Sequence, residues 1–197
     1  MATAVERWKD IWARFSGRGT YPHQLAGLLL FPLRRAIFSP RQLVARLQLT
    51  PSSRVLEVGP GPGYFSLDVA RAVPDGRLEL VDIQHEMLQK ARRRLHRAGI
   101  RRAGFIQADG VALPFPPNLF DAAFLVAVLG EIPNPQACVA SIAGLLRLGG
   151  RLVVVELPGD PDAMSEAELR ALTLGTDLQC VETVRESRAT VTTFIRA

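Results

Sequence analysis

The chain has 197 residues, 48% of them hydrophobic and 22% charged, with only two cysteines. This length provides for one well-packed domain and is too short for two, and no apolar run is long enough to span a membrane. No cleavable signal peptide opens the sequence, and Glu6 and Asp10 argue against a mitochondrial transit peptide. We therefore expect a cytoplasmic protein without a disulfide framework.

Positive charge is concentrated in the first half of the chain. Residues 1–102 hold 18 Lys and Arg against 8 Asp and Glu, whereas residues 103–197 hold 6 against 11. Six arginines crowd one region: Arg92, Arg93, Arg94, Arg97, Arg101 and Arg102. An anionic partner such as RNA or a lipid head group would explain them, and so would a solvated helix face whose cations suit the helix dipole. No aromatic residues interleave with them in the sequence, which favours the solvated face and argues against nucleic acid.

The first fifty residues predict helices. Residues 3–16 carry Trp8, Trp12 and Phe15 at helical spacing, which predicts an amphipathic helix with an aromatic face. That face could cover its own domain, rest on a membrane surface beside a lipid substrate, or pack against a second subunit in a homodimer, and we favour the first interpretation. A leucine-rich stretch follows, and Ser39-Pro40 predicts the start of a helix that ends at Leu47.

The most informative stretch comes next. Residues 55–63 read Val-Leu-Glu-Val-Gly-Pro-Gly-Pro-Gly, an apolar strand that ends near an acid and leads into Gly59, Gly61 and Gly63. Alternating glycines allow a tight turn and the close approach of a ligand. Because residues 64–73 have helical spacing, the unit is strand, glycine loop and helix, which is how open α/β sheets build nucleotide sites. A dinucleotide fingerprint would need its third glycine at position 64, where this chain has Tyr64.

Acids also end the next two predicted strands. Residues 78–82 form a predicted strand ending in Asp82, about 20 residues beyond the glycines. A carboxylate at this place can accept hydrogen bonds from both hydroxyls of a ribose. A helix N-cap or first-turn acid is the structural alternative for Asp82, because a helix is predicted over 83–98. Residues 105–110 form a third strand, which includes Asp109.

The remaining elements complete an alternating pattern. Strands are predicted over 120–126 and 149–156, with no helix in the 113–118 connection, and a helix over 163–174. Two final strands, 177–185 and 189–196, are joined by a link short enough for a hairpin, so one of them runs antiparallel. We predict an α/β Rossmann-like three-layer sandwich: a seven-stranded, mostly parallel sheet with a terminal antiparallel hairpin and a helical N-terminal lid.

Taken together, the motifs resemble those of class I S-adenosylmethionine-dependent methyltransferases. The E-x-G-x-G-x-G loop resembles their motif I, and Val128 to Pro135 and Gly149 to Glu156 resemble later segments of the family. The first part of the chain resembles a group of small prokaryotic methyltransferases like those of ubiquinone and menaquinone biosynthesis. The resemblance implies one structural domain in which residues 1–50 form a lid or substrate cap and residues 51–197 bind S-adenosylmethionine.

The resemblance also implies a role for particular residues. The glycine loop would surround the methionine moiety with support from Glu57, Asp82 would hold the ribose, and Val126 would lie near the methyl donor. The other residues expected to bind the cofactor are Ile83 and Met87, which would flank the adenine, and Asp109 and Gly110, at its amino edge. His23 and Glu131 are the candidates for a general base, although Glu131 and Gly130 depart from the family pattern.

Several acceptor classes are demoted by what the sequence lacks. There is no Asn/Asp-Pro-Pro-aromatic motif after the fourth strand, Cys138 lies too far along for cytosine C5 chemistry, and no acid cluster predicts a metal site. Cys138 and Cys180 are expected to be buried fillers. We therefore predict methyl transfer to a small-molecule or lipid-like acceptor. The alternatives are a cofactor-binding scaffold without catalysis and, less favoured, an RNA methyltransferase.

Overall fold

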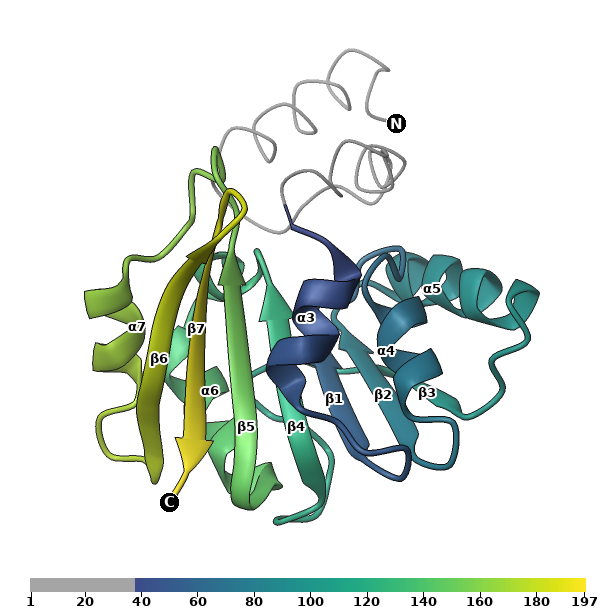
Figure 1. Cartoon of the computed structure of the whole chain (residues 1–197), viewed down its shortest axis with the longest axis horizontal. Helices are drawn as coiled ribbons and strands as arrows, with labels where there is room; N and C mark the ends of the chain where they lie inside the picture. Colours follow the sequence, from purple (N-terminus) through teal and green to yellow (C-terminus); the bar gives the residue numbers. More distant parts are fainter. Residues whose placement is uncertain (1–37) are drawn as a thin grey trace, which may run out of the picture.

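A seven-stranded sheet organises residues 38–197, the part of the chain that the computed structural model describes. The strand order is β3-β2-β1-β4-β5-β7-β6, and every neighbouring pair is parallel except those that involve β7. Figure 1 shows the parallel strands with their carboxyl ends at one edge and β7 returning between β5 and β6. The predicted fold class is confirmed for this part of the chain.

Strands and helices follow one another as the sequence predicts, alternating except between the third and fourth strands and in the final hairpin. In chain order they are α3 (Pro40–Leu47), β1 (Arg54–Val58), α4 (Ser66–Ala72), β2 (Arg77–Asp82), α5 (His85–Arg97), β3 (Ala103–Gln107), β4 (Phe120–Val126), the 3-10 helix η3 (Leu129–Glu131), α6 (Pro135–Leu145), β5 (Leu146–Glu156), α7 (Glu166–Leu172), β6 (Leu178–Glu186) and β7 (Ala189–Arg196).

Helices cover both faces of the sheet. On one face α3, α4 and α5 bury Leu43, Val69 and Leu95 against the strands, and on the other face α6 and α7 bury Ile142 and Leu169. Successive strand residues point to opposite faces, so the central strands supply apolar side chains to both layers. This three-layer packing leaves the carboxyl edge of the sheet for the loops that carry the functional residues.

Helix α3 begins where the sequence predicts. The Ser39 hydroxyl accepts from the Gln42 backbone N–H, and the Gln42 side chain accepts from the Ser39 N–H at 2.8 Å, which completes a capping box. Pro40 occupies the first turn, where its missing N–H costs nothing. Helix α3 ends at Leu47, because Gln48 takes the left-handed conformation.

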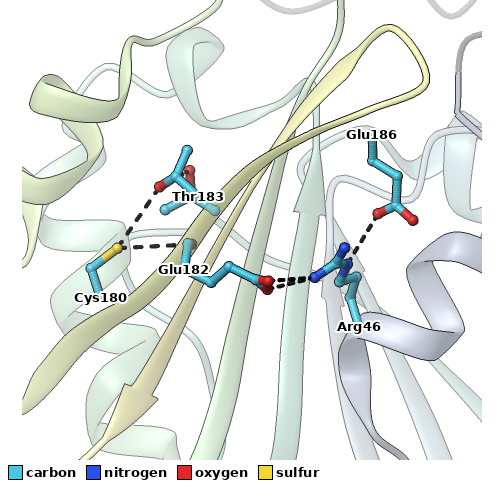
Figure 2. Close-up of polar contacts among 6 residues, drawn as sticks. Arg46, Cys180, Glu182, Thr183 and Glu186 are labelled. Carbon is cyan, nitrogen blue, oxygen red and sulfur yellow. Dashed lines mark hydrogen bonds and ion pairs between the residues drawn. The ribbon is translucent and has the colours of Figure 1, made fainter.

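Side chains tie α3 to the terminal hairpin. Arg46 Nη1 lies 2.5 Å from Glu182 Oε2, and its Nε donates to Glu186 Oε2 at 3.0 Å (Figure 2). Gln42 donates to the Ser187 hydroxyl at 3.0 Å. Ser187 lies in the tight link between β6 and β7 and has a φ of 56°. The hairpin predicted from this short link is confirmed, and α3 is hydrogen-bonded to the turn of that hairpin.

Some predicted boundaries are wrong for local reasons. Strand β3 ends at Gln107, so Asp109 lies in the following loop rather than at the strand end. Helix α4 starts at Ser66 because residues 61–65 form turns, and α7 starts at Glu166 because the Ser165 side chain caps it there. The connection from β3 to β4 contains no helix, as predicted.

Other predictions fall outside the described residues. The aromatic helix at 3–16, the leucine-rich stretch, His23 and any dimer contact through the N-terminal helices lie in residues 1–37, and only the last part of the predicted 1–50 lid is described. Between residues 38 and 197, none of the helices combines the length and apolarity needed to cross a membrane.

Candidate functional site

The glycine loop after β1 has the conformation that its sequence requires. Gly59, Gly61 and Gly63 all have positive φ, at 70°, 53° and 79°, which other residues rarely adopt. The Gly59 N–H donates to the Val81 carbonyl at 2.8 Å and so fastens the loop to β2. A Cβ on Gly59 would lie 2.5 Å from Val128 Cγ2, so glycine is also required here by space.

Glu57 lies beneath this loop in an apolar setting. Its side chain points to the α3–α5 face from the end of β1 and is only 3% exposed. Burial raises the pKa of Glu57 to about 8; the nearby Ser66 hydroxyl opposes this shift and the Asp82 carboxylate adds to it. Glu57 Oε2 has no hydrogen-bond partner. A buried polar atom of this kind is expensive unless a ligand completes it.

Asp82 ends β2 beside Glu57. Its Oδ1 accepts from the Gln84 backbone N–H at 2.9 Å. Burial raises the pKa of Asp82 to about 6, against the opposing effect of backbone N–H groups of Gln84 and Gly61. The N-cap of α5 is Gln84, and the acid in its first turn is Glu86, so the alternative in which Asp82 caps that helix is wrong. Its carboxylate is held by a local turn at the sheet edge.

The residues expected around an adenine differ in accessibility. Ile83, directly after Asp82, is 54% exposed, and its carbonyl accepts from the Gln107 side chain at 3.0 Å. Met87 is only 2% exposed in α5. Ile83 is thus available for stacking against a ligand, and Met87 would need a side-chain movement to contact one.

The loop after β3 approaches the same edge. The Ala108 N–H donates to the Asp82 carbonyl at 3.3 Å, and exposed Asp109 accepts through Oδ1 from the Val111 N–H. Gly110 packs closely, since a Cβ there would lie 3.3 Å from the Cys138 sulfur. Cys138 is buried, as predicted, and burial together with the Asp109 carboxylate raises the pKa of its thiol to about 12.

The segment after β4 borders the site on its other side. Val126 is half-buried at the end of β4, and Ala127 has a φ of 53° while its N–H donates to the Val155 carbonyl at 2.8 Å. Gly130 fits closely against the loop after β5: a Cβ there would lie 1.9 Å from the Asp162 carbonyl oxygen. This packing explains the departure from the family pattern at 130. Glu131 is half-buried in η3.

Glu156 is the acid that the sequence interpretation missed. It ends β5, is 5% exposed, and its Oε1 has no hydrogen-bond partner. Burial and the charge of Asp160 raise the pKa of Glu156 to about 8, against a backbone hydrogen bond from Met164. The same signal that marked Asp82, an acid closing an apolar strand, could have identified it.

The side chains present fit a cationic amino-acid and nucleoside ligand. Besides Glu57 Oε2, the buried Tyr64 hydroxyl lacks a hydrogen-bond partner beside the glycine loop. Asp82 lies at the end of the neighbouring strand, where a ribose would be held. Among residues 38–197 no group of three or more His, Cys, Asp or Glu side chains is placed to hold a metal ion.

The arginine-rich helix end differs from expectation in one respect. Phe105 of β3 lies beneath α5, with the Arg92 guanidinium carbon 5.1 Å from its ring centroid and the His96 ring at 6.1 Å. An aromatic ring therefore does lie among these arginines in space, although none does in sequence. His85 contacts Gln89 on the same helix, away from β1 and β4.

Known proteins resemble this chain in part of its sequence and in its fold. Residues 55–150 match the family described as a methyltransferase domain. The chain is similar to the ubiquinone/menaquinone biosynthesis C-methyltransferase UbiE of Ectopseudomonas mendocina, with 36% identity over 56% of this chain and 45% of that protein. The same enzyme of Shewanella pealeana is 35% identical over 54% of this chain and 43% of that protein. The chain thus spans less than half the length of these curated relatives.

Solved structures agree on the fold. A SAM-dependent methyltransferase from Aquifex aeolicus superposes with a TM-score of 0.82 at 18% identity, covering 89% of this chain and 98% of that one. The [4+2]-cyclase SpnF superposes with a TM-score of 0.71 at 20% identity, covering 80% of each chain. These likenesses concern architecture alone.

Proposed function

Since residues 55–150 of this chain belong to the class I S-adenosylmethionine-dependent methyltransferase family, we propose that the protein transfers a methyl group to a small-molecule acceptor. The cofactor implied by that family is S-adenosylmethionine, which supplies an already activated sulfonium methyl group. The observation that carries the proposal is the buried, unpartnered Glu57 oxygen beneath a glycine loop and beside Asp82. Such a pair of acids suits a ligand that is cationic at one end and carries a ribose at the other.

We assign the binding roles to residues at the ends of neighbouring strands. Glu57 and the glycine loop would hold the methionine moiety, Asp82 the ribose hydroxyls, and Ile83 and Asp109 the adenine. Val126, at the end of β4, would lie on the methyl side. Because methyl transfer needs mainly an aligned nucleophile, the protein's main task is to orient the acceptor and exclude water.

The similar C-methyltransferases suggest an acceptor class. Their names place them in ubiquinone and menaquinone biosynthesis. Residues 55–150, which match the methyltransferase-domain family, contain the glycine loop and the second, third and fourth strands. We therefore propose a ring acceptor of the quinol type. A cofactor-binding protein without methyl transfer is the second candidate, because a cyclase shares this fold.

Calorimetry with S-adenosylhomocysteine tests the cofactor proposal. We expect saturable binding by the wild-type protein, weakened at least tenfold in Asp82→Asn, since a hydrogen bond to a charged group contributes about 1.5–3 kcal/mol. Asp75→Asn, an exposed acid at the opposite end of β2, is the control and should bind as the wild type does. Equal affinity in Asp82→Asn would rule out the ribose role.

Methyl transfer is then measured with methyl-labelled S-adenosylmethionine and a 1,4-naphthoquinol with a free ring carbon. Label in the quinol, found by mass spectrometry, is the expected result. Binding of S-adenosylhomocysteine without label in this or any extracted small-molecule, lipid or RNA fraction would favour the non-catalytic candidate.

A further inference from the structure

The order of the strands places one unassigned acid on the acceptor side. The strands β2, β1, β4 and β5 are consecutive in the sheet. Asp82, Val126 and Glu156 end β2, β4 and β5, and Glu57 is the last residue but one of β1. If Asp82 holds the ribose and the loop after β1 holds the methionine moiety, the acceptor must approach from beyond β1, over the ends of β4 and β5. Glu156 ends the strand on that side.

The ends of β4 and β5 are held together. Val126 pairs with Val155, and the Ala127 N–H donates to the Val155 carbonyl at 2.8 Å. The loops beyond them also touch, because Gly130 fits against the Asp162 backbone. Glu156 therefore lies where the segments after β4 and β5 meet.

Burial of the Glu156 carboxyl group destabilises the folded protein. Glu156 is 5% exposed, and its Oε1 has no hydrogen-bond partner, which destabilises the folded state relative to a satisfied carboxyl group. The three preceding residues are buried valines, so an apolar side chain would suit the strand better. Burial raises the pKa of Glu156 to about 8, in the range suited to a general base. Buried ionisable side chains whose pKa is shifted and which lie beside a binding site are candidates for a functional role.

We propose that Glu156 binds the methyl acceptor through its unpartnered oxygen and takes the acceptor's proton. This inference rests on the proposed function. The Glu156 carboxylate takes the proton of the quinol hydroxyl, and the electron pair of that O–H bond moves into the ring. A π electron pair of the free ring carbon then forms the bond to the methyl carbon while the methyl–sulfur bond breaks, and the pair of that bond stays on sulfur. The hydrogen of the methylated ring carbon leaves last as a proton to solvent, which restores the aromatic ring.

The acids around Glu156 define the competing candidates. Asp160, in the loop after β5, is the charge that acts on it. Asp162 and Glu131 lie on the two segments that touch at Gly130. Thr190, the residue of β7 opposite Glu156, is uncharged. Of these acids, Glu131 lies on the β4 side and is the alternative base.

Kinetics with the naphthoquinol provide the first test. Wild-type kcat/KM should rise with pH towards a plateau above about 8, and Glu156→Gln should lose that limb together with about 100-fold in kcat. Its affinity for S-adenosylhomocysteine should change less than twofold. Glu166→Gln, an exposed acid of α7, should behave as the wild type. Loss of the limb in Glu131→Gln but not in Glu156→Gln would overturn the proposal.

Carboxyl 13C NMR of glutamate-labelled protein provides a readout that does not depend on turnover. The resonance absent from Glu156→Gln should titrate near pH 8 and shift when 1,4-naphthoquinone is added to the S-adenosylhomocysteine complex. A resonance that titrates near the ordinary glutamate pKa of about 4.3, or that does not shift when 1,4-naphthoquinone is added, would refute the proposed role of Glu156. Failure to bind S-adenosylhomocysteine would instead remove the proposed function itself.

Discussion

The buried acids at the strand ends lack the usual compensation. None of the ion pairs within residues 38–197 involves Glu57, Asp82 or Glu156. Burial without a cation disfavours the charged form, which is why the pKa of each carboxyl is raised. A sulfonium or ammonium group of a ligand would supply the missing positive charge. These buried carboxyl groups therefore favour a ligand that carries a positive charge.

Glu57 should make the stability of the ligand-free protein depend on pH. Its folded pKa of about 8 lies above the ordinary value of 4.5, so the folded state keeps a proton that the unfolded state releases between these values. Stability from this group is present below pH 4.5 and is lost as the pH rises to 8. Glu57→Gln should therefore be more stable than the wild type at pH 8.5, by about 1–3 kcal/mol in urea unfolding, and should lose this advantage at pH 5. Glu86→Gln, an exposed acid, should follow the wild-type curve; a pH-independent difference for Glu57→Gln would contradict the argument.

Gly59 combines two constraints that can be separated. Gly59→Ala introduces a strained positive φ and a Cβ against the stiff Val128 side chain, and we expect it to cost about 2–4 kcal/mol and to weaken S-adenosylhomocysteine binding. Gly99→Ala has the same φ problem, with φ at 82°, but open space, and should cost only about 1–2 kcal/mol. The double variant Gly59→Ala/Val128→Ala should recover part of the difference in thermal unfolding. Equal losses in both single variants would show that the contact with Val128 is unimportant.

At the scale of elements, the sequence predicts what local patterns determine. Strand β4 occupies residues 120–126 as predicted, and α3 ends at Leu47, because a buried apolar run and a capping signal are both local. The end of β3 is misplaced because pairing with β2 stops at Gln107, which depends on a neighbouring strand. Glu156 closes a buried apolar strand, which is a local signal for a candidate site residue, but that its Oε1 lacks a hydrogen-bond partner is visible only in the folded chain.

The tie between α3 and the hairpin should contribute measurably to stability. Arg46 bridges Glu182 and Glu186 from a partly buried position, so Arg46→Gln leaves two acids side by side. We expect a loss of about 1–2 kcal/mol in urea unfolding at low salt, and a smaller loss at 1 M salt. Arg170→Gln breaks the more exposed pair with Glu166 and should cost less than about 0.5 kcal/mol. Equal effects of the two substitutions would indicate that the ion pairs of Arg46 stabilise the fold no more than an ordinary surface ion pair does.

At the scale of the whole molecule, the strand order follows from the family resemblance rather than from residue patterns. Alternating strands and helices predict a parallel sheet, and the short final link predicts a hairpin. Neither pattern places β7 between β5 and β6. Contacts such as that between Gln42 and Ser187, 145 positions apart, become visible only in the folded chain. Whether a buried polar atom lacks a hydrogen-bond partner can likewise be seen only in the folded chain.

Ligand binding should stabilise the whole domain, because its contacts reach the ends of several central strands. At a concentration 100 times its Kd, S-adenosylhomocysteine should add about 2.7 kcal/mol to the free energy of unfolding. For a protein of this size that corresponds to a rise in Tm of about 5–11 °C. Asp82→Asn should lose most of this rise at the same ligand concentration, whereas Asp75→Asn should keep it. Differential scanning calorimetry over a range of ligand concentrations separates the cases, because a Tm that does not rise with ligand in the wild-type protein would mean that the strand ends do not form a cofactor site.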